Sequence, residues 1–219
     1  IFVDLVDAGL NVKVEAPAKN ELVNVGTTTN FKISASENST ISLFINEKEI
    51  KTETGTELNA SHTFTATGDF TCVAKAESNG TIHYDTVFIC VASGPENATR
   101  PEGLQDGITY YDDDATKVTL SLYSKNNNNQ ISQNVFVLGD FNNWSYSTEY
   151  QMKKDGETGY FWLDITGLEP GKEYVFQYVK DAVENLFSTL DANSDIELIM
   201  SGRSVLYPNI KNMVDDAIT

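Results

Sequence analysis

Short runs of alternating apolar and polar residues dominate the first 93 positions. In residues 10–16, Leu10, Val12 and Val14 are apolar and the residues between them are polar, which is the period-two pattern of a half-buried β-strand. Similar runs follow at residues 30–33, 40–45, 62–66, 70–76 and 81–91. Turn-forming residues separate them, at residues 20–21, 38–39, 55, 68–69 and 79–80. Several short strands at this spacing predict a β-sandwich.

The second half of the chain centres on one apolar run. Residues 135–138 read Val-Phe-Val-Leu, which is too short for a helix and predicts a strand buried on both faces. Gly139 permits a sharp bend and Asn142-Asn143 suits a turn, so the turn aims Trp144 outward. A flat indole with one N–H suits the C–H face of a sugar ring. Packing of Trp144 back onto the core is the open alternative.

Alternating strands surround this run. In residues 160–165, Phe161 shares one face with Leu163 and Ile165, and Tyr160 shares the other with Trp162. Two aromatic surfaces are therefore candidates, Trp144 with Tyr146 and Trp162 with Tyr160. Further strands are predicted at residues 108–111, 116–123, 173–180, 196–200 and 204–207, and weak helical character at residues 182–190.

Composition narrows the functional classes. The formal net charge is −17, which argues against a nucleic-acid partner because phosphate binding needs clustered Lys and Arg. No apolar run reaches the roughly 18 residues of a transmembrane segment. The chain begins at Ile1, which favours a mature or trimmed fragment. We expect an extracytoplasmic protein, whether secreted, periplasmic or a cell-surface lipoprotein.

Chemical motifs for catalysis or cofactors are missing from the sequence. No nucleophile elbow, phosphate loop or His/Cys cluster is present, so no catalytic residue, metal site or cofactor is predicted. Asp112-Asp113-Asp114 is interpreted as a solvated turn rather than a calcium loop. Cys72 and Cys90 flank the hairpin turn Asn79-Gly80 at similar distances, so a cross-strand disulfide and two buried thiols both remain open.

The segment Gly139-Asp140-Phe141-Asn142-Asn143-Trp144 resembles the GxFNxW turn of family-48 carbohydrate-binding modules, the glycogen-binding domains of the immunoglobulin-like early-set type. The stretch from Arg100-Pro101-Glu102-Gly103-Leu104 to Glu173-Tyr174-Val175-Phe176-Gln177-Tyr178 is similar to the N-terminal domain of family-13 glycoside hydrolases, the α-amylase and branching-enzyme group of gut Bacteroidetes. The resemblance implies that Trp144 stacks on glucose.

Two departures weaken the family's pattern. The basic residue that assists in those modules corresponds to Gln177, and their second Trp, after an Asp-Gly turn, has no counterpart in residues 181–185. The family's linker to the catalytic barrel is only partly matched, at residues 190–195. The barrel's catalytic acids would lie beyond Thr219, so we predict a chain that is not itself an enzyme.

The sequence thus predicts an all-β chain of two immunoglobulin-like β-sandwich domains in tandem. The expected boundaries are a tail at 1–7, a sandwich at 8–93, a linker at 94–100, an early-set sandwich resembling family-48 modules at 101–210 and a tail at 211–219. The resemblance implies a non-catalytic module that binds starch- or glycogen-type α-glucan. Its candidate contacts are Trp144, Tyr146, Asn142, Asn143 and Gln177.

Besides α-glucan, the resemblance implies two candidate protein partners. A catalytic barrel and an outer-membrane glycan-uptake protein are candidate partners. In the alternative, the two sandwiches are structural spacers or docking modules without glycan binding, and their aromatic residues belong to a core or an interface.

Overall fold

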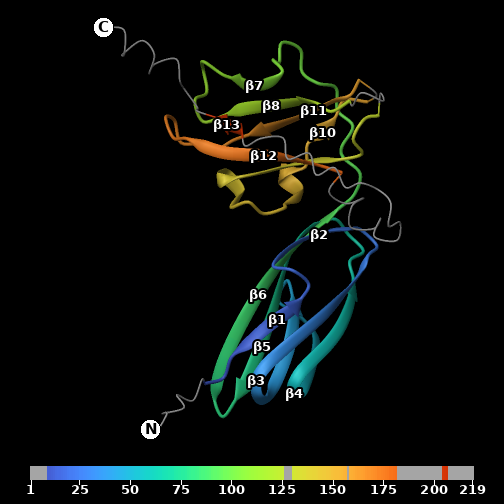
Figure 1. The fold of residues 1–219 in the computed structure, drawn as a ribbon, viewed down its shortest axis with the longest axis vertical. Coiled ribbons are helices and arrows are strands. Elements are labelled where there is room, and N and C mark those ends of the chain that lie inside the picture. Colours follow the sequence, from blue (N-terminus) through green and yellow to red (C-terminus); the bar gives the residue numbers. More distant parts are fainter. Residues whose placement is uncertain (1–8, 126–129, 157, 182–203, 207–219) are drawn as a thin grey trace, which may run out of the picture. The chain divides into compact units, whose positions relative to one another are not determined.

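A computed structural model describes residues 9–125, 130–156, 158–181 and 204–206. The chain divides into two compact units, Ile1–Ser93 and Gly94–Thr219, each built from β-strands (Figure 1). In the described ranges the helical elements are two single 3-10 turns, so the all-β prediction is confirmed. Those ranges hold no helix with the length and apolar character needed to cross a membrane.

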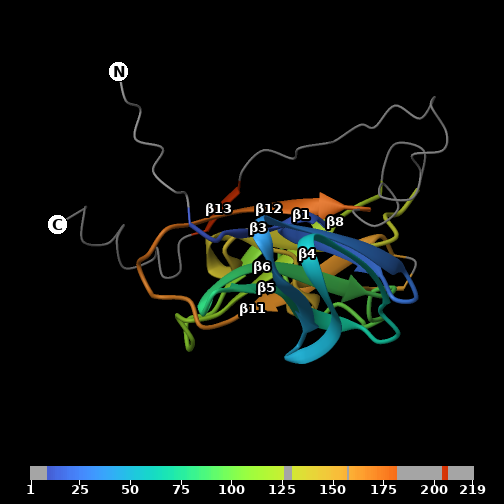
Figure 2. The same cartoon turned by 90° about the horizontal axis from the view of Figure 1, so that it is seen from below.

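Six strands form the first unit: β1 (Val12–Ala16), β2 (Asn20–Asn24), β3 (Thr28–Ile45), β4 (Lys48–Thr63), β5 (Gly68–Ser78) and β6 (Thr81–Ala92). The long strands β3 and β4 run side by side (Figure 1, Figure 2). Their pairing is interrupted between Ser34 and Ser39. Before the interruption β3 also pairs with β1, and after it β3 pairs with β5.

The interruption lets one continuous sheet fold into two layers. Strand β1 contacts β5 and β6 without pairing with either, as expected of strands in facing layers. The core between the layers draws on both halves of β3, with Phe31 and Ile33 before the interruption and Ile41 and Leu43 after it. None of these four residues is more than 1% exposed. The sequence predicted two strands here, but the exposed residues 36–38 remain extended as a bulge.

Strand β2 corrects a second prediction. Asn20-Glu21 was expected to form a turn, yet residues 20–24 pair in parallel with β6. Leu22 and Val23 are buried by this pairing, which shows tertiary burial overriding the local turn preference of Asn20.

The two cysteines are free buried thiols, which decides between the two alternatives. The Asn79-Gly80 turn is confirmed, with both residues at positive φ, and it fixes the register of the hairpin. In that register Cys72 lies opposite Val87 and Cys90 lies opposite Asp69. The two cysteines are three positions out of register, so their side chains point to opposite faces of the sheet. Burial raises the pKa of the Cys72 thiol to about 12.

Two facing sheets form the second unit. One has the order β10–β11–β8–β7 and the other β13–β12–β9. The strands are β7 (Gly107–Tyr110), β8 (Val118–Tyr123), β9 (Val135–Gly139), β10 (Lys153–Lys154), β11 (Tyr160–Ile165), β12 (Tyr174–Lys180) and β13 (Ser204–Leu206). Their core includes Val118, Leu120, Val137, Phe161 and Phe176. Strand β9 is buried at all five positions, which confirms the two-faced burial predicted for residues 135–138.

Part of the predicted linker pairs with this second sandwich. The Ala98 N–H donates to the Lys154 carbonyl, and the Lys154 N–H donates to the Glu96 carbonyl, at 2.9 and 2.8 Å. Residues 96–98 therefore pair in parallel beside β10 rather than connecting freely. The predicted tails, the helix at residues 182–190 and the strand at residues 196–200 lie outside the described residues.

Candidate functional site

Glycine is required at the end of β9 by a close approach of the backbone. A Cβ on Gly139 would lie 2.7 Å from the Val175 carbonyl oxygen and 2.8 Å from the Phe176 Cβ, closer than any side chain tolerates. The φ of Gly139 is −171°, so the constraint is space rather than backbone conformation. Strand β9 can therefore pass tightly against β12 just before the chain turns.

A 3-10 turn follows at Asp140–Asn142, and the Asn142 side chain closes it. The Asn142 Oδ1 accepts a hydrogen bond from the Gly139 N–H at 2.8 Å, and its Nδ2 donates to the Val137 carbonyl at 2.9 Å. Both ends of this carboxamide thus act inside the turn. Asn142 was predicted as a polar contact for sugar, but the structure uses it to shape the turn.

The next two residues, Asn143 and Trp144, have φ of 52° and 58°. This left-handed conformation costs a residue with a side chain about 1–2 kcal/mol. The Trp144 N–H donates to the Gly139 carbonyl at 3.0 Å, which holds the backbone in place. Strained residues that the surrounding structure maintains are concentrated at functional sites, so this conformation marks Trp144 as a candidate.

The Asp140 carboxylate holds the Trp144 indole ring in place. Its Oδ1 accepts the Trp144 Nε1–H at 2.9 Å, and its Oδ2 accepts the Val175 N–H at 2.8 Å. One carboxylate therefore ties the turn, the ring and β12 together. Trp144 stays 37% exposed, so it does not pack back into the core. The outcome is a fixed, partly exposed aromatic ring, called here the plate.

The remaining predicted contacts lie around this plate in different ways. Tyr146 is half-buried and packs edge-on against Phe136, with ring centroids 5.5 Å apart. Gln177 is half-buried on β12, two positions beyond Val175 and on the same face. Asn143 is exposed beside Trp144. Asn143 therefore offers an amide group next to Trp144 in the chain, Gln177 offers one on the strand that Asp140 binds, and Tyr146 packs on Phe136 of β9.

The second predicted aromatic surface is covered where Trp162 lies. Its Nε1 donates to the Ala98 carbonyl at 3.0 Å, and the Lys153 Nζ lies 5.0 Å from the centre of its ring. The Ala98 carbonyl therefore takes the indole N–H, and Lys153 lies over the ring that a ligand would stack on. Tyr160, on the same face, has different neighbours, the Tyr123 ring and the Arg100 guanidinium.

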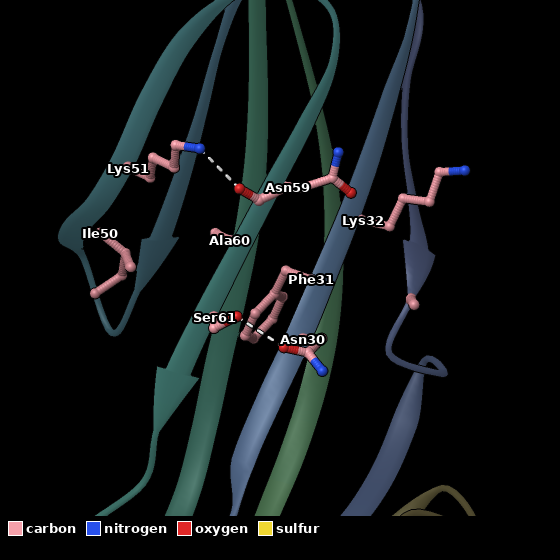
Figure 3. A pocket seen from close by; sticks show the side chains of 9 residues that line it. Asn30, Phe31, Lys32, Ile50, Lys51, Asn59, Ala60 and Ser61 are labelled. Carbon is pink, nitrogen blue, oxygen red and sulfur yellow. Dashed lines mark hydrogen bonds between the residues drawn. The ribbon is translucent and has the colours of Figure 1, made fainter.

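A groove of about 530 Å³ lies in the first unit, along the bend of β4 (Figure 3). Several of its polar side chains already hydrogen-bond to groups of the lining. Ser61 donates to the Asn30 Oδ1 at 2.7 Å, and the Lys51 Nζ donates to the Asn59 carbonyl at 2.8 Å. Phe31, the aromatic residue of the lining, is 1% exposed. The groove thus lacks an open ring for stacking.

Acidic residues in the described ranges do not gather into a metal centre. No group of three His, Cys, Asp or Glu there has the geometry to hold a metal ion. In the predicted acidic turn, the Asp114 carboxylate accepts hydrogen bonds from the Thr116 hydroxyl and N–H. These bonds lower the pKa of Asp114, which is the behaviour of a turn cap.

Sequence reasoning missed Asp140 as a functional residue. Its role needs a carboxylate one position after the bend and four positions before the indole, which is a spacing visible in the sequence. The bond to Val175 was not visible, because it depends on how β12 pairs with β9.

This geometry defines the second unit as an immunoglobulin-like sandwich that presents an aromatic residue on a rigid turn. Residues 106–194 match the family model of carbohydrate-binding module 48, described as the isoamylase N-terminal domain. The match confirms the resemblance seen in the Gly139–Trp144 segment.

Curated relatives agree with the family match. A 54-residue segment is 43% identical to the 1,4-alpha-glucan branching enzyme GlgB of Clostridium perfringens strain ATCC 13124, covering 25% of this chain and 8% of that enzyme. A 51-residue segment is 47% identical to GlgB 2 of strain SM101, covering 23% and 7%. The chain thus spans less than a tenth of the length of these relatives.

Among solved structures, the chain aligns with the Clostridium thermocellum CbhA fibronectin(III)-like modules at a TM-score of 0.39 and 16% identity, covering 79% of this chain and 88% of that one. The Bacteroides uniformis beta-glucuronidase 3 aligns at a TM-score of 0.35 and 9% identity, covering 91% and 24%.

Proposed function

We propose that the second unit binds α-glucan by stacking a pyranose ring on Trp144. The observation that carries this proposal is the indole held open at a strained backbone position by Asp140. The family-48 match and the branching-enzyme relatives support the ligand class. Asn143 and Gln177 supply amide groups for sugar hydroxyls, while Asn142 and Tyr146 support the plate.

The chain acts in this proposal as a non-catalytic accessory region of an amylase- or branching-type enzyme. Stacking on an aromatic ring contributes roughly 1–3 kcal/mol when bases stack on protein aromatics, and we apply that scale to sugars. A single plate with a few hydrogen bonds then gives a dissociation constant on the order of 1 mM. Weak binding of this kind suits a module that holds polysaccharide near an active site, where many sugar units compensate for low affinity.

Titration of maltoheptaose tests the proposal directly. The wild type should bind with millimolar affinity by NMR chemical-shift changes, and Trp144→Ala should weaken binding at least fivefold because the stacking surface is removed. Trp162→Phe is the matched control, since Trp162 is already covered by Ala98 and Lys153. Equal affinities of wild type and Trp144→Ala would rule out the site.

A docking role is the second candidate. Ile82, Tyr84 and Phe88 form an exposed apolar row along one face of β6, at 42%, 62% and 46% exposure. Exposed apolar rows of this kind are found where proteins meet partners. If the docking role alone holds, maltoheptaose leaves the spectrum of the wild type unchanged.

A further inference from the structure

We propose a second saccharide-binding surface on the outer face of the sheet β7–β8–β11–β10, formed by Tyr123, Tyr160, Arg100 and Asp106 and called here the Tyr123 surface. It stacks a pyranose ring on Tyr123 and binds a neighbouring sugar hydroxyl through Asp106. It rests on the proposed function for its ligand class alone, because its two tyrosines lie on β8 and β11, whereas Trp144 follows β9 of the other sheet.

Tyr123 supplies the plate. It lies directly opposite Tyr160 on the neighbouring strand, with ring centroids 5.0 Å apart and planes tilted by 53°. Its ring also lies against Gly159, where a Cβ would be 3.0 Å from the Tyr123 Cε2. Gly159 has a φ of 94° and therefore admits the ring with little strain. Tyr123 is held on two sides and still 48% exposed.

Arg100 fixes the other ring. Its guanidinium carbon lies 4.6 Å from the centre of the Tyr160 ring, a cation–π arrangement. Its Nε donates to the Ser121 Oγ at 2.8 Å, and its Nη2 donates to the Leu104 carbonyl at 2.6 Å. Since Ser121 is buried, the guanidinium is anchored to the sheet itself.

Asp106 presents the polar edge of the surface. Its two oxygens accept from the Arg100 Nη2 at 3.1 Å and from the Tyr160 hydroxyl at 3.2 Å. Its side chain remains 66% exposed, and a carboxylate offers about four acceptor positions. A fixed, exposed acceptor beside an aromatic plate is the arrangement that a sugar ring needs, with C–H groups on the plate and a hydroxyl donating to the carboxylate.

The charge of Asp106 and the net charge of the chain favour a neutral polyhydroxylated ligand over a phosphate or an acidic ligand. Asp106 repels a phosphate or an acidic ligand, and the net charge of −17 does the same at longer range. The groups are already ordered by their bonds to one another, so binding loses little side-chain entropy. On the same sheet, Trp162 is covered by Ala98, so the open part of this face is the Tyr123 end.

Affinity electrophoresis through gels containing soluble glycogen, performed in the Trp144→Ala background, isolates the Tyr123 surface. Adding Tyr123→Ala should weaken the remaining retardation at least fivefold, while Tyr123→Phe should retain it within twofold because the ring is kept. Asp106→Asn should weaken it about threefold. Tyr84→Ala, which removes an exposed tyrosine of the first unit, is the matched control and should have no effect.

The outcomes separate this proposal from the Trp144 site. If Trp144→Ala already abolishes retardation, the Tyr123 surface is refuted and the Trp144 site stands. If Trp144→Ala changes nothing and Tyr123→Ala weakens binding, the Trp144 site fails and the Tyr123 surface stands. If Tyr123→Ala and Tyr84→Ala behave alike while both melt as the wild type does, the inference is wrong.

Discussion

The two tryptophans of the second unit show how one residue type takes two fates in the same sandwich. Trp162 lies in the middle of β11, where its indole N–H bonds to Ala98 and Lys153 covers its ring. Trp144 follows the end of β9 on a tight turn, where its N–H bonds to Asp140 within the turn. Both indole N–H groups have an acceptor. Trp162 is covered by Ala98 and Lys153, whereas Trp144 bonds within its own turn and stays 37% exposed.

The difference comes from the backbone that carries each ring. A strand residue presents its side chain to whatever segment lies against it, and residues 96–98 pair beside β10, where the Ala98 carbonyl accepts from the Trp162 indole. A turn residue at positive φ leaves the sheet plane altogether. Exposure of an aromatic residue is therefore decided by the conformation of its backbone and by nearby segments, rather than by its hydrophobicity.

The largest loss of stability is expected for a substitution at Gly139, where β9 passes close to β12. Gly139→Ala places a Cβ 2.7 Å from a backbone oxygen, so we expect a loss of about 3 kcal/mol in the unfolding free energy of the second unit. Tryptophan fluorescence during urea unfolding reports on this unit, since both tryptophans belong to it. Gly94→Ala, which has open space and no positive φ, should leave the midpoint unchanged. Equal midpoints for both variants would contradict the packing argument.

Removal of the covered indole should have the next largest effect. Trp162→Ala removes a half-buried ring and the hydrogen bond to Ala98, so the unfolding free energy should fall by about 2 kcal/mol. Calorimetry of the melt measures the loss. Maltoheptaose affinity of the folded variant should match that of the wild type. A large loss of affinity without loss of stability would reverse the roles assigned to the two tryptophans.

Asp140→Ala should have a smaller effect on stability and a visible effect on the exposed ring. The variant loses bonds to Trp144 and Val175, so stability should fall by about 1 kcal/mol. Fluorescence anisotropy of Trp144, measured in a Trp162→Phe background, should decrease because the ring gains freedom. Glu149→Ala removes another exposed acid of this region and should leave the anisotropy unchanged, and a rigid indole in Asp140→Ala would show that the clamp is dispensable.

The smallest effect on stability is expected for the open ring itself. Trp144→Gly relieves the left-handed strain but loses the bond to Asp140 and adds flexibility to the unfolded chain. These terms nearly cancel, so the unfolding free energy should stay within about 1 kcal/mol of the wild type, while maltoheptaose binding weakens at least fivefold, as in Trp144→Ala. A loss of several kcal/mol would mean that Trp144 belongs to the core.

Much of the fold was predictable because it depends on patterns of period two. The alternation at residues 10–16 and 160–165 correctly indicated which residues face the cores. The hairpin at Asn79-Gly80 was predictable from the turn chemistry of those two residues. These features are local, so a single segment contains the information.

The errors involve partners distant in the sequence. In the parallel pairing of β2 with β6, Leu22 lies opposite Cys90. No residue near position 22 predicts this pairing. The sequence pattern left the disulfide open, and the register decides it: a difference of three positions puts Cys72 and Cys90 on opposite faces of the sheet. For the site, Trp144 was predicted outward, but the use of Asn142 inside the turn and the clamp by Asp140 required the arrangement of β9 and β12.

The clamp on the indole has a consequence for recognition. Asp140 already accepts the hydrogen bond from the single N–H of the Trp144 ring. A molecule stacked on that ring therefore contacts carbon atoms and π-electrons alone. Such a surface cannot hydrogen-bond to a hydroxyl, so it selects only by shape: an axial hydroxyl on the stacked face prevents close contact with the ring. Any preference that depends on hydrogen bonds must then arise at the periphery, from the amides beside the ring, and the curvature of the chain laid across it adds a further selection by shape.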